Sequence, residues 1–109
     1  MVNRLKTIEE WQALLEKSDE QPFLLFKLSM TSLSSVTAKK EMESLVTHLP
    51  RYVVISQLDK KVSNAVEQDT GVKHETPQLL IIKGKRAIWQ ATRYQIKQSV
   101  VLEAIATYV

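Results

Sequence analysis

The sequence predicts an α/β domain of three layers, in which helices cover both faces of a mixed central sheet. Two apolar runs, Phe23–Phe26 and Leu79–Ile82, are continuous rather than alternating, which is typical of strands that are buried on both faces. Stretches with apolar residues three or four positions apart, typical of helices, lie before, between and after these runs. Such alternation along a chain favours a sheet enclosed by two helical layers.

The composition is that of an ordinary globular protein. The 109 residues are 44% hydrophobic and 25% charged, which suits one domain over residues 1–109 with a single core. The N-terminus lacks the apolar segment of a signal peptide, and no apolar run approaches the length of a membrane span. We therefore expect a cytoplasmic protein without a membrane partner.

The net charge of +3 arises from 15 basic and 12 acidic residues that are scattered along the chain. No basic patch with interleaved aromatic residues is present, so we expect no nucleic-acid partner. The chain has no cysteine and only two distant histidines. We therefore expect no metal site, no disulfide and no thiol catalysis by this chain.

The first helix is predicted by Thr7 and Glu10, which have the spacing of a capping box. Trp11 lies on its apolar face, and the polar segment 16–21 ends it before Pro22. Pro22 suits the first residue of the strand Phe23–Phe26.

A second helix is predicted from Ser32 to Leu49, with Thr31 or Ser32 as its N-cap and Pro50 ending it. Its apolar stripe comprises Ala38, Met42, Leu45, Val46 and Leu49. The start of this helix is the natural place for a site, because unpaired backbone N–H groups and the helix dipole favour an anion there.

The rest of the chain predicts two more helices and three more strands. Tyr52–Ser56 should pair parallel to Phe23–Phe26, and Asp59–Thr70 should form a helix that Gly71 ends. Gly84 should form a tight turn between Leu79–Ile82 and an antiparallel last strand, Arg86–Gln90. The last helix should begin near Thr92–Gln95 and bury Ile96, Val100, Ala104, Ile105 and Tyr108. This order of elements is thioredoxin-like.

Three segments carry a resemblance to a known family. Residues 26–31 read Phe-Lys-Leu-Ser-Met-Thr, residues 32–35 read Ser-Leu-Ser-Ser, and residues 74–78 read His-Glu-Thr-Pro-Gln. They resemble the Phe-Lys-His-Ser-Thr, Cys-Pro-Ile-Ser and His-Glu-Ser-Pro-Gln segments of the YtxJ family, the monothiol bacilliredoxins of the thioredoxin superfamily. The resemblance covers nearly the whole chain, including the hairpin around Gly84.

The resemblance implies a catalytic position at Ser32. The family's cysteine thiolate there takes bacillithiol from a mixed disulfide with a protein, which makes bacillithiol the implied cosubstrate and bacillithiolated protein segments the implied partners. A serine hydroxyl cannot exchange a disulfide, so we expect Ser32 to be inactive in that chemistry. Leu28 and Leu33 also stand where the family has histidine and proline. The departure is therefore wider than one sulfur-to-oxygen exchange.

The resemblance also implies a substrate groove around a cis proline. Thr76-Pro77 is similar to the cis-proline segment of thioredoxin-fold proteins, which lies opposite the helix start and leaves the backbone before the proline free to pair with a substrate. The groove residues expected on this basis are Thr31, Leu33, Ser35, His74, Thr76 and Pro77.

Two hypotheses follow for the function. One is a non-catalytic module that binds a thiol or a peptide in the retained groove. The other is a thiol–disulfide oxidoreductase that removes bacillithiol from proteins, represented here by a Cys-to-Ser variant. Neither requires a resident cofactor, and the sequence indicates no oligomeric state.

Overall fold

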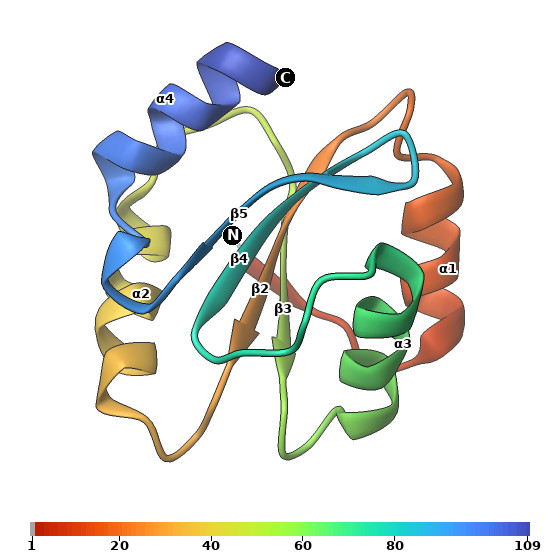
Figure 1. The fold of residues 1–109 in the computed structure, drawn as a ribbon, viewed down its shortest axis with the longest axis horizontal. Coiled ribbons are helices and arrows are strands. Elements are labelled where there is room, and N and C mark those ends of the chain that lie inside the picture. The colour runs from red at the N-terminus through yellow and green to blue at the C-terminus, as the bar shows by residue number, and fades with distance from the viewer. Residues whose placement is uncertain (1) are drawn as a thin grey trace.

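A five-stranded sheet in the order β1-β3-β2-β4-β5 forms the centre of the computed structural model, which describes residues 2–109 (Figure 1). The strands are β1 (Val2–Arg4), β2 (Phe23–Leu28), β3 (Arg51–Ile55), β4 (Gln78–Lys83) and β5 (Arg86–Thr92). The helices are α1 (Ile8–Glu16), α2 (Leu33–Ser44), α3 (Lys60–Thr70) and α4 (Gln98–Tyr108), with a 3₁₀ turn η1 (Arg93–Gln95) before α4. The predicted three-layer fold is confirmed, since α1 and α3 cover one face and α2 and α4 the other.

The central strand β2 explains why its apolar run is continuous. Leu24 and Phe26 belong to the core under α2 and α4, whereas Phe23 and Leu25 belong to the core under α1 and α3. Successive side chains of a strand point to opposite faces, so a strand covered on both sides has no polar face.

The predicted start of α1 is also confirmed. The Thr7 Oγ1 accepts from the Glu10 N–H at 3.1 Å, and the Glu10 carboxylate accepts from the Thr7 N–H at 3.0 Å. Trp11 is fully buried, and its indole N–H donates to Asp69 Oδ2 at 2.8 Å. The helix start is therefore determined by local sequence, and Trp11 joins α1 to α3.

Strand β1 was not predicted, because three residues carry too little alternation to indicate a strand. It pairs parallel with β3 and is held by Arg4, whose guanidinium donates to Asp59 at 2.9 and 2.6 Å. Asp59 is almost fully buried and also accepts from the Ile55 N–H at 3.0 Å. The Asp59 carboxylate thus joins β1, β3 and the start of α3.

We expect Asp59→Ala to lower the free energy of unfolding at pH 7. The substitution leaves the Ile55 N–H without its acceptor, which alone costs about 1–2 kcal/mol, and it removes the partner of Arg4. The hydrogen bonds from Arg4 hold the pKa of Asp59 below its ordinary value. The Asp59 carboxylate therefore contributes to the free energy of unfolding above the ordinary carboxyl pKa, and this contribution disappears as the pH falls through the lowered pKa of the folded state.

Urea denaturation of the wild type and Asp59→Ala at pH 7 and at pH 3 measures this effect. A difference that stays constant between the two pH values would contradict the assigned role of the carboxylate.

Helix α2 is shorter than predicted, because it ends at Ser44 and not at Leu49. Leu45 is extended, with ψ 128°, and the Arg51 guanidinium donates to the Met42 carbonyl oxygen at 2.7 Å. This long-range bond supplies a partner for one of the last carbonyls of the helix. Leu45 and Leu49 are buried as predicted, but Val46 is 85% exposed because the helical periodicity has ended before it.

The sheet is mixed, but the direction of one strand was wrong in the prediction. β2 and β3 are parallel as predicted, and β5 is antiparallel to β4. However, β4 itself runs antiparallel to β2, so β4 is the strand that opposes the others. The reason is the segment 71–77, which returns the chain to the edge where β2 and β3 end (Figure 1).

The last helix begins later than predicted, at Gln98, and buries a different face. Val101 is buried, whereas Val100 and Tyr108 are 39% and 52% exposed. The 3₁₀ turn η1 and the extended Lys97 interrupt the helical period after Ile96, which shifts the buried face by one residue. Ile96, Ala104 and Ile105 are buried as predicted.

Candidate functional site

Ser32 is the N-cap of α2, as predicted. Its backbone is extended, with φ −98° and ψ 126°, and its Oγ accepts from the Ser35 N–H at 3.4 Å. The Ser32 and Ser34 hydroxyls are hydrogen-bonded to each other at 2.7 Å. Neither partner is a base, so nothing in these contacts activates Ser32 as a nucleophile.

The other hydroxyls of this segment hold the loop between β2 and α2. Ser35 is buried, and its Oγ accepts from the Ser29 N–H at 3.0 Å. The Ser29 Oγ contacts the Thr31 Oγ1 at 3.2 Å and accepts from the Gln57 amide at 2.7 Å. Capping and loop bonding therefore account for Ser35 and Ser29, and Thr31 remains exposed at the start of the helix.

Leu33, one of the predicted groove residues, has 87% of its surface accessible. Met30, two residues before Ser32, is 63% exposed. Both apolar side chains therefore flank the helix start in solvent, and burial against a partner would remove this surface from water.

The Thr76–Pro77 peptide bond is cis, and Pro77 is buried. Lys27 of β2 pairs with Gln78 of β4, so this segment lies beside the end of β2. The Pro77 carbonyl accepts from the Arg93 N–H at 3.0 Å. Within residues 2–109, by contrast, no hydrogen bond uses the Thr76 N–H or carbonyl.

His74 contacts α3 and has no hydrogen bond to Ser32 or Thr76 among the described residues. Its Nδ1 lies 3.2 Å from the Ser63 Oγ, and its backbone N–H donates to the Glu67 carboxylate. Burial and, secondarily, the charge of Lys27 lower the pKa of the His74 ring. These contacts anchor the segment 71–77 to α3, and a place for His74 in the groove stays a prediction.

Lys27 was not predicted from the sequence to be a buried charged residue. It is 1% exposed, and its Nζ has no hydrogen-bond partner among the described residues. The Oε1 of Gln78, its neighbour on β4, also has no hydrogen-bond partner within residues 2–109. Burial lowers the pKa of Lys27 to about 8, although the charge of Glu67 acts in the opposite direction. A signal was available, because Lys27 is a charged residue within an otherwise apolar buried strand.

Comparison with known proteins assigns the family. The family model of the monothiol bacilliredoxin BrxC matches residues 3–101. The chain belongs to the monothiol bacilliredoxin family. Its sequence has no cysteine.

Solved structures agree with the bacilliredoxin family in fold. A candidate oxidoreductase with a thioredoxin fold superposes with a TM-score of 0.86 at 22% identity, over 95% of this chain and 93% of that one. Thioredoxin from Malassezia sympodialis gives a TM-score of 0.78 at 12% identity, over 99% and 90% of the two chains. Thioredoxin from Fasciola hepatica gives 0.76 at 10% identity, over 98% and 99%. The thioredoxin fold predicted from the order of elements is thus confirmed.

The described part of this bacilliredoxin contains no group of three or more His, Cys, Asp or Glu residues placed to hold a metal ion. None of its helices combines the length and the apolar character needed to cross a bilayer.

A cavity of about 700 Å³ lies beside α2 in this bacilliredoxin, but only one predicted site residue, Ser35, lines it. The cavity is therefore distinct from the groove expected around Ser32, Thr76 and Pro77.

Proposed function

We propose that this bacilliredoxin-family protein is a non-catalytic module that binds a thiol cosubstrate or a peptide segment at Ser32, Thr76 and Pro77. The observation that carries the proposal is the role of Ser32 at the position of the family's cysteine. Its hydroxyl caps α2, and the chain contains no cysteine that could supply a thiol. Binding remains available to such a site, whereas disulfide exchange does not.

The start of α2 supports binding of an anion. Within residues 2–109, no hydrogen bond uses the N–H groups of Leu33 and Ser34, and no acidic residue lies in the first turn. These donors and the helix dipole favour a carboxylate, such as those of the malate moiety of bacillithiol. Ser32 and Thr31 are uncharged and do not oppose its approach.

The Thr76 main chain supports binding of an extended peptide. Its N–H and carbonyl have no partner within the described residues, and only Pro77 separates it from β4. An extended segment can use such groups by strand pairing. The exposed Leu33 side chain would cover an apolar side chain of the same segment.

Titration of the ¹⁵N-labelled protein with bacillithiol disulfide tests the anion site. We expect the largest amide shifts at Leu33 and Ser34. Ser32→Asp should weaken binding at least tenfold, because its carboxylate repels the ligand, whereas Ser32→Asn should bind within about twofold of the wild type. Asp and Asn are both strong N-caps, so this pair differs in charge and not in the integrity of α2.

A second experiment tests peptide binding at Thr76 with a peptide that bears a mixed disulfide with bacillithiol. Methylation of the backbone nitrogen that pairs with Thr76 should weaken binding, and methylation of the next nitrogen should not. Absence of binding by either ligand, or equal affinities of Ser32→Asp and Ser32→Asn for the disulfide, would refute the corresponding part of the proposal.

A further inference from the structure

The face of β3 toward α2 is incompletely covered. β3 lies between β1 and β2, yet Arg51, Val53 and Ile55 on this face are only partly buried. Val54, on the opposite face, is fully buried. An interior strand with two half-buried aliphatic residues on one face indicates space next to it, and the cavity of about 700 Å³ occupies that space.

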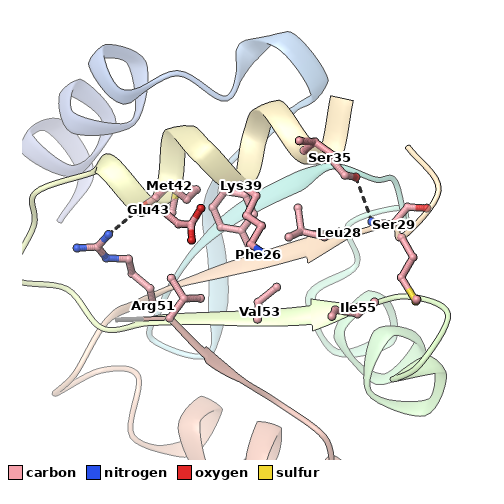
Figure 2. A pocket seen from close by; sticks show the side chains of 13 residues that line it. Phe26, Leu28, Ser29, Ser35, Lys39, Met42, Glu43, Arg51, Val53 and Ile55 are labelled. Carbon is pink, nitrogen blue, oxygen red and sulfur yellow. Dashed lines mark hydrogen bonds between the residues drawn. The ribbon is translucent and has the colours of Figure 1, made fainter. Parts of the chain in front are cut away.

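Helix α2 forms the opposite wall of the cavity. Ala38 and Met42 pack into the core, and the adjacent stripe Val36, Lys39 and Glu43 lines the cavity. Figure 2 shows Lys39 and Glu43 extending from α2. The three- and four-residue spacing of this stripe keeps all three side chains on one side of the helix.

The floor and one end of the cavity are apolar. Phe26 and Leu28 of β2 pair in register with Val53 and Ile55 of β3, so these four side chains form a continuous surface. Val2 of β1 and Met30 also line the cavity. A long apolar surface beside solvent favours an aliphatic chain as the occupant.

The margin of the cavity is cationic. The Arg51 guanidinium is positioned by its bond to the Met42 carbonyl at 2.7 Å, which leaves further N–H groups for a ligand (Figure 2). Lys39 is exposed on the same margin, and no ion pair within the described residues joins Glu43 to either cation. Two cations and one anion favour a ligand with a single negative charge.

We propose that the cavity between α2 and β3 binds a free linear aliphatic carboxylate, with its chain over Phe26, Leu28 and Val53 and its carboxylate at Arg51 and Lys39. The site is separate from the one at Ser32. The hydrogen bond between Ser29 and Ser35 forms part of its wall, so the two sites adjoin at the loop after β2 and the first turn of α2.

Calorimetric titration with decanoate below its micelle concentration tests the proposal. We expect saturable binding of one equivalent. Val36→Trp should fill the opening and weaken binding at least tenfold, whereas Thr37→Trp, at an exposed position outside the cavity, should leave it unchanged. Circular dichroism of both variants verifies that each is folded.

Charge reversal tests the carboxylate position. Lys39→Glu should weaken decanoate binding at least tenfold, whereas Lys40→Glu, at another exposed position that is absent from the cavity lining, should have less than a twofold effect. Decanol should bind at least tenfold more weakly than decanoate. Equal affinity for decanol, equal effects of the two charge reversals, or binding to anionic vesicles without binding of monomeric decanoate would each overturn the proposal. Failure at this cavity would leave the proposal for Ser32 unaffected, because none of these variants changes that site.

Discussion

At pH 7, Lys27→Met is expected to raise the free energy of unfolding by about 3 kcal/mol. The Lys27 ammonium is buried near Glu67 of α3, without a hydrogen-bond partner among the described residues. Its charged form therefore loses hydration on folding and gains little in return. Methionine has a similar length and flexibility, and it removes the charge without leaving a large cavity.

The effect should depend on pH in a defined direction. The pKa of Lys27 is lowered from its ordinary 10.5 to about 8 in the folded protein. Below about pH 8 the Lys27 amine is protonated in both the folded and the unfolded protein, so the full free-energy cost of burying the charge is present. Between about 8 and 10.5 the unfolded chain binds more protons, so stability of the wild type rises with pH relative to Lys27→Met. The difference in the free energy of unfolding between the wild type and Lys27→Met should therefore become small at high pH.

Denaturation by urea from pH 6 to pH 10.5 measures this gap. Lys40→Met is the matched control, since Lys40 is exposed on α2 and should give no pH-dependent difference. A Lys27→Met protein that is no more stable than the wild type at pH 7 would show that a buried acceptor, such as the Gln78 Oε1, accepts a hydrogen bond from the ammonium in solution.

Ser32→Cys is expected to create a thiol with a pKa below the ordinary value of about 8.5. The reason is the position at the start of α2, where the N–H groups of Leu33 and Ser34 have no acceptor within the described residues. The thiolate should attack bacillithiol disulfide: a new sulfur–sulfur bond forms to one bacillithiol, and the second bacillithiol leaves as a thiolate. The rate of alkylation by iodoacetamide as a function of pH measures the pKa, and mass spectrometry measures the adduct.

Thr37→Cys is the matched control for this experiment, because Thr37 is exposed on the same helix beyond its first turn. Its thiol should titrate near 8.5 and react more slowly at pH 7. An equal pKa at the two positions would contradict the electrostatic role of the helix start. Efficient release of bacillithiol from a protein mixed disulfide by Ser32→Cys would favour the alternative hypothesis, a Cys-to-Ser variant of an oxidoreductase.

Much of the fold was predictable because its signals are local. The capping box of Thr7 and Glu10 starts α1, Gly71 with φ 72° ends α3, and Gly84 with φ 60° turns the hairpin. Ser32 as the N-cap of α2 follows from the same kind of evidence. In each case the residue and its partner lie within a few positions, so the sequence contains both sides of the interaction.

The tertiary structure decided what depends on distant partners. Helix α2 ends earlier than predicted, and the Arg51 guanidinium donates a hydrogen bond to the Met42 carbonyl near that end. Strand β1 forms because it pairs with β3 and because Asp59 accepts hydrogen bonds from Arg4. The path of segment 71–77 sets the direction of β4.

Some features of the candidate sites could likewise be predicted from the sequence, whereas others depend on the tertiary structure. The sequence by itself determined the family resemblance, the hydroxyl at Ser32 and the absence of a thiol. Only the folded chain shows that Lys27 is buried without a hydrogen-bond partner in residues 2–109, that His74 contacts α3, and that a cavity lies between α2 and β3. Burial and cavities arise from side chains brought together by sheet register and helix packing, and no local pattern records which residues will meet.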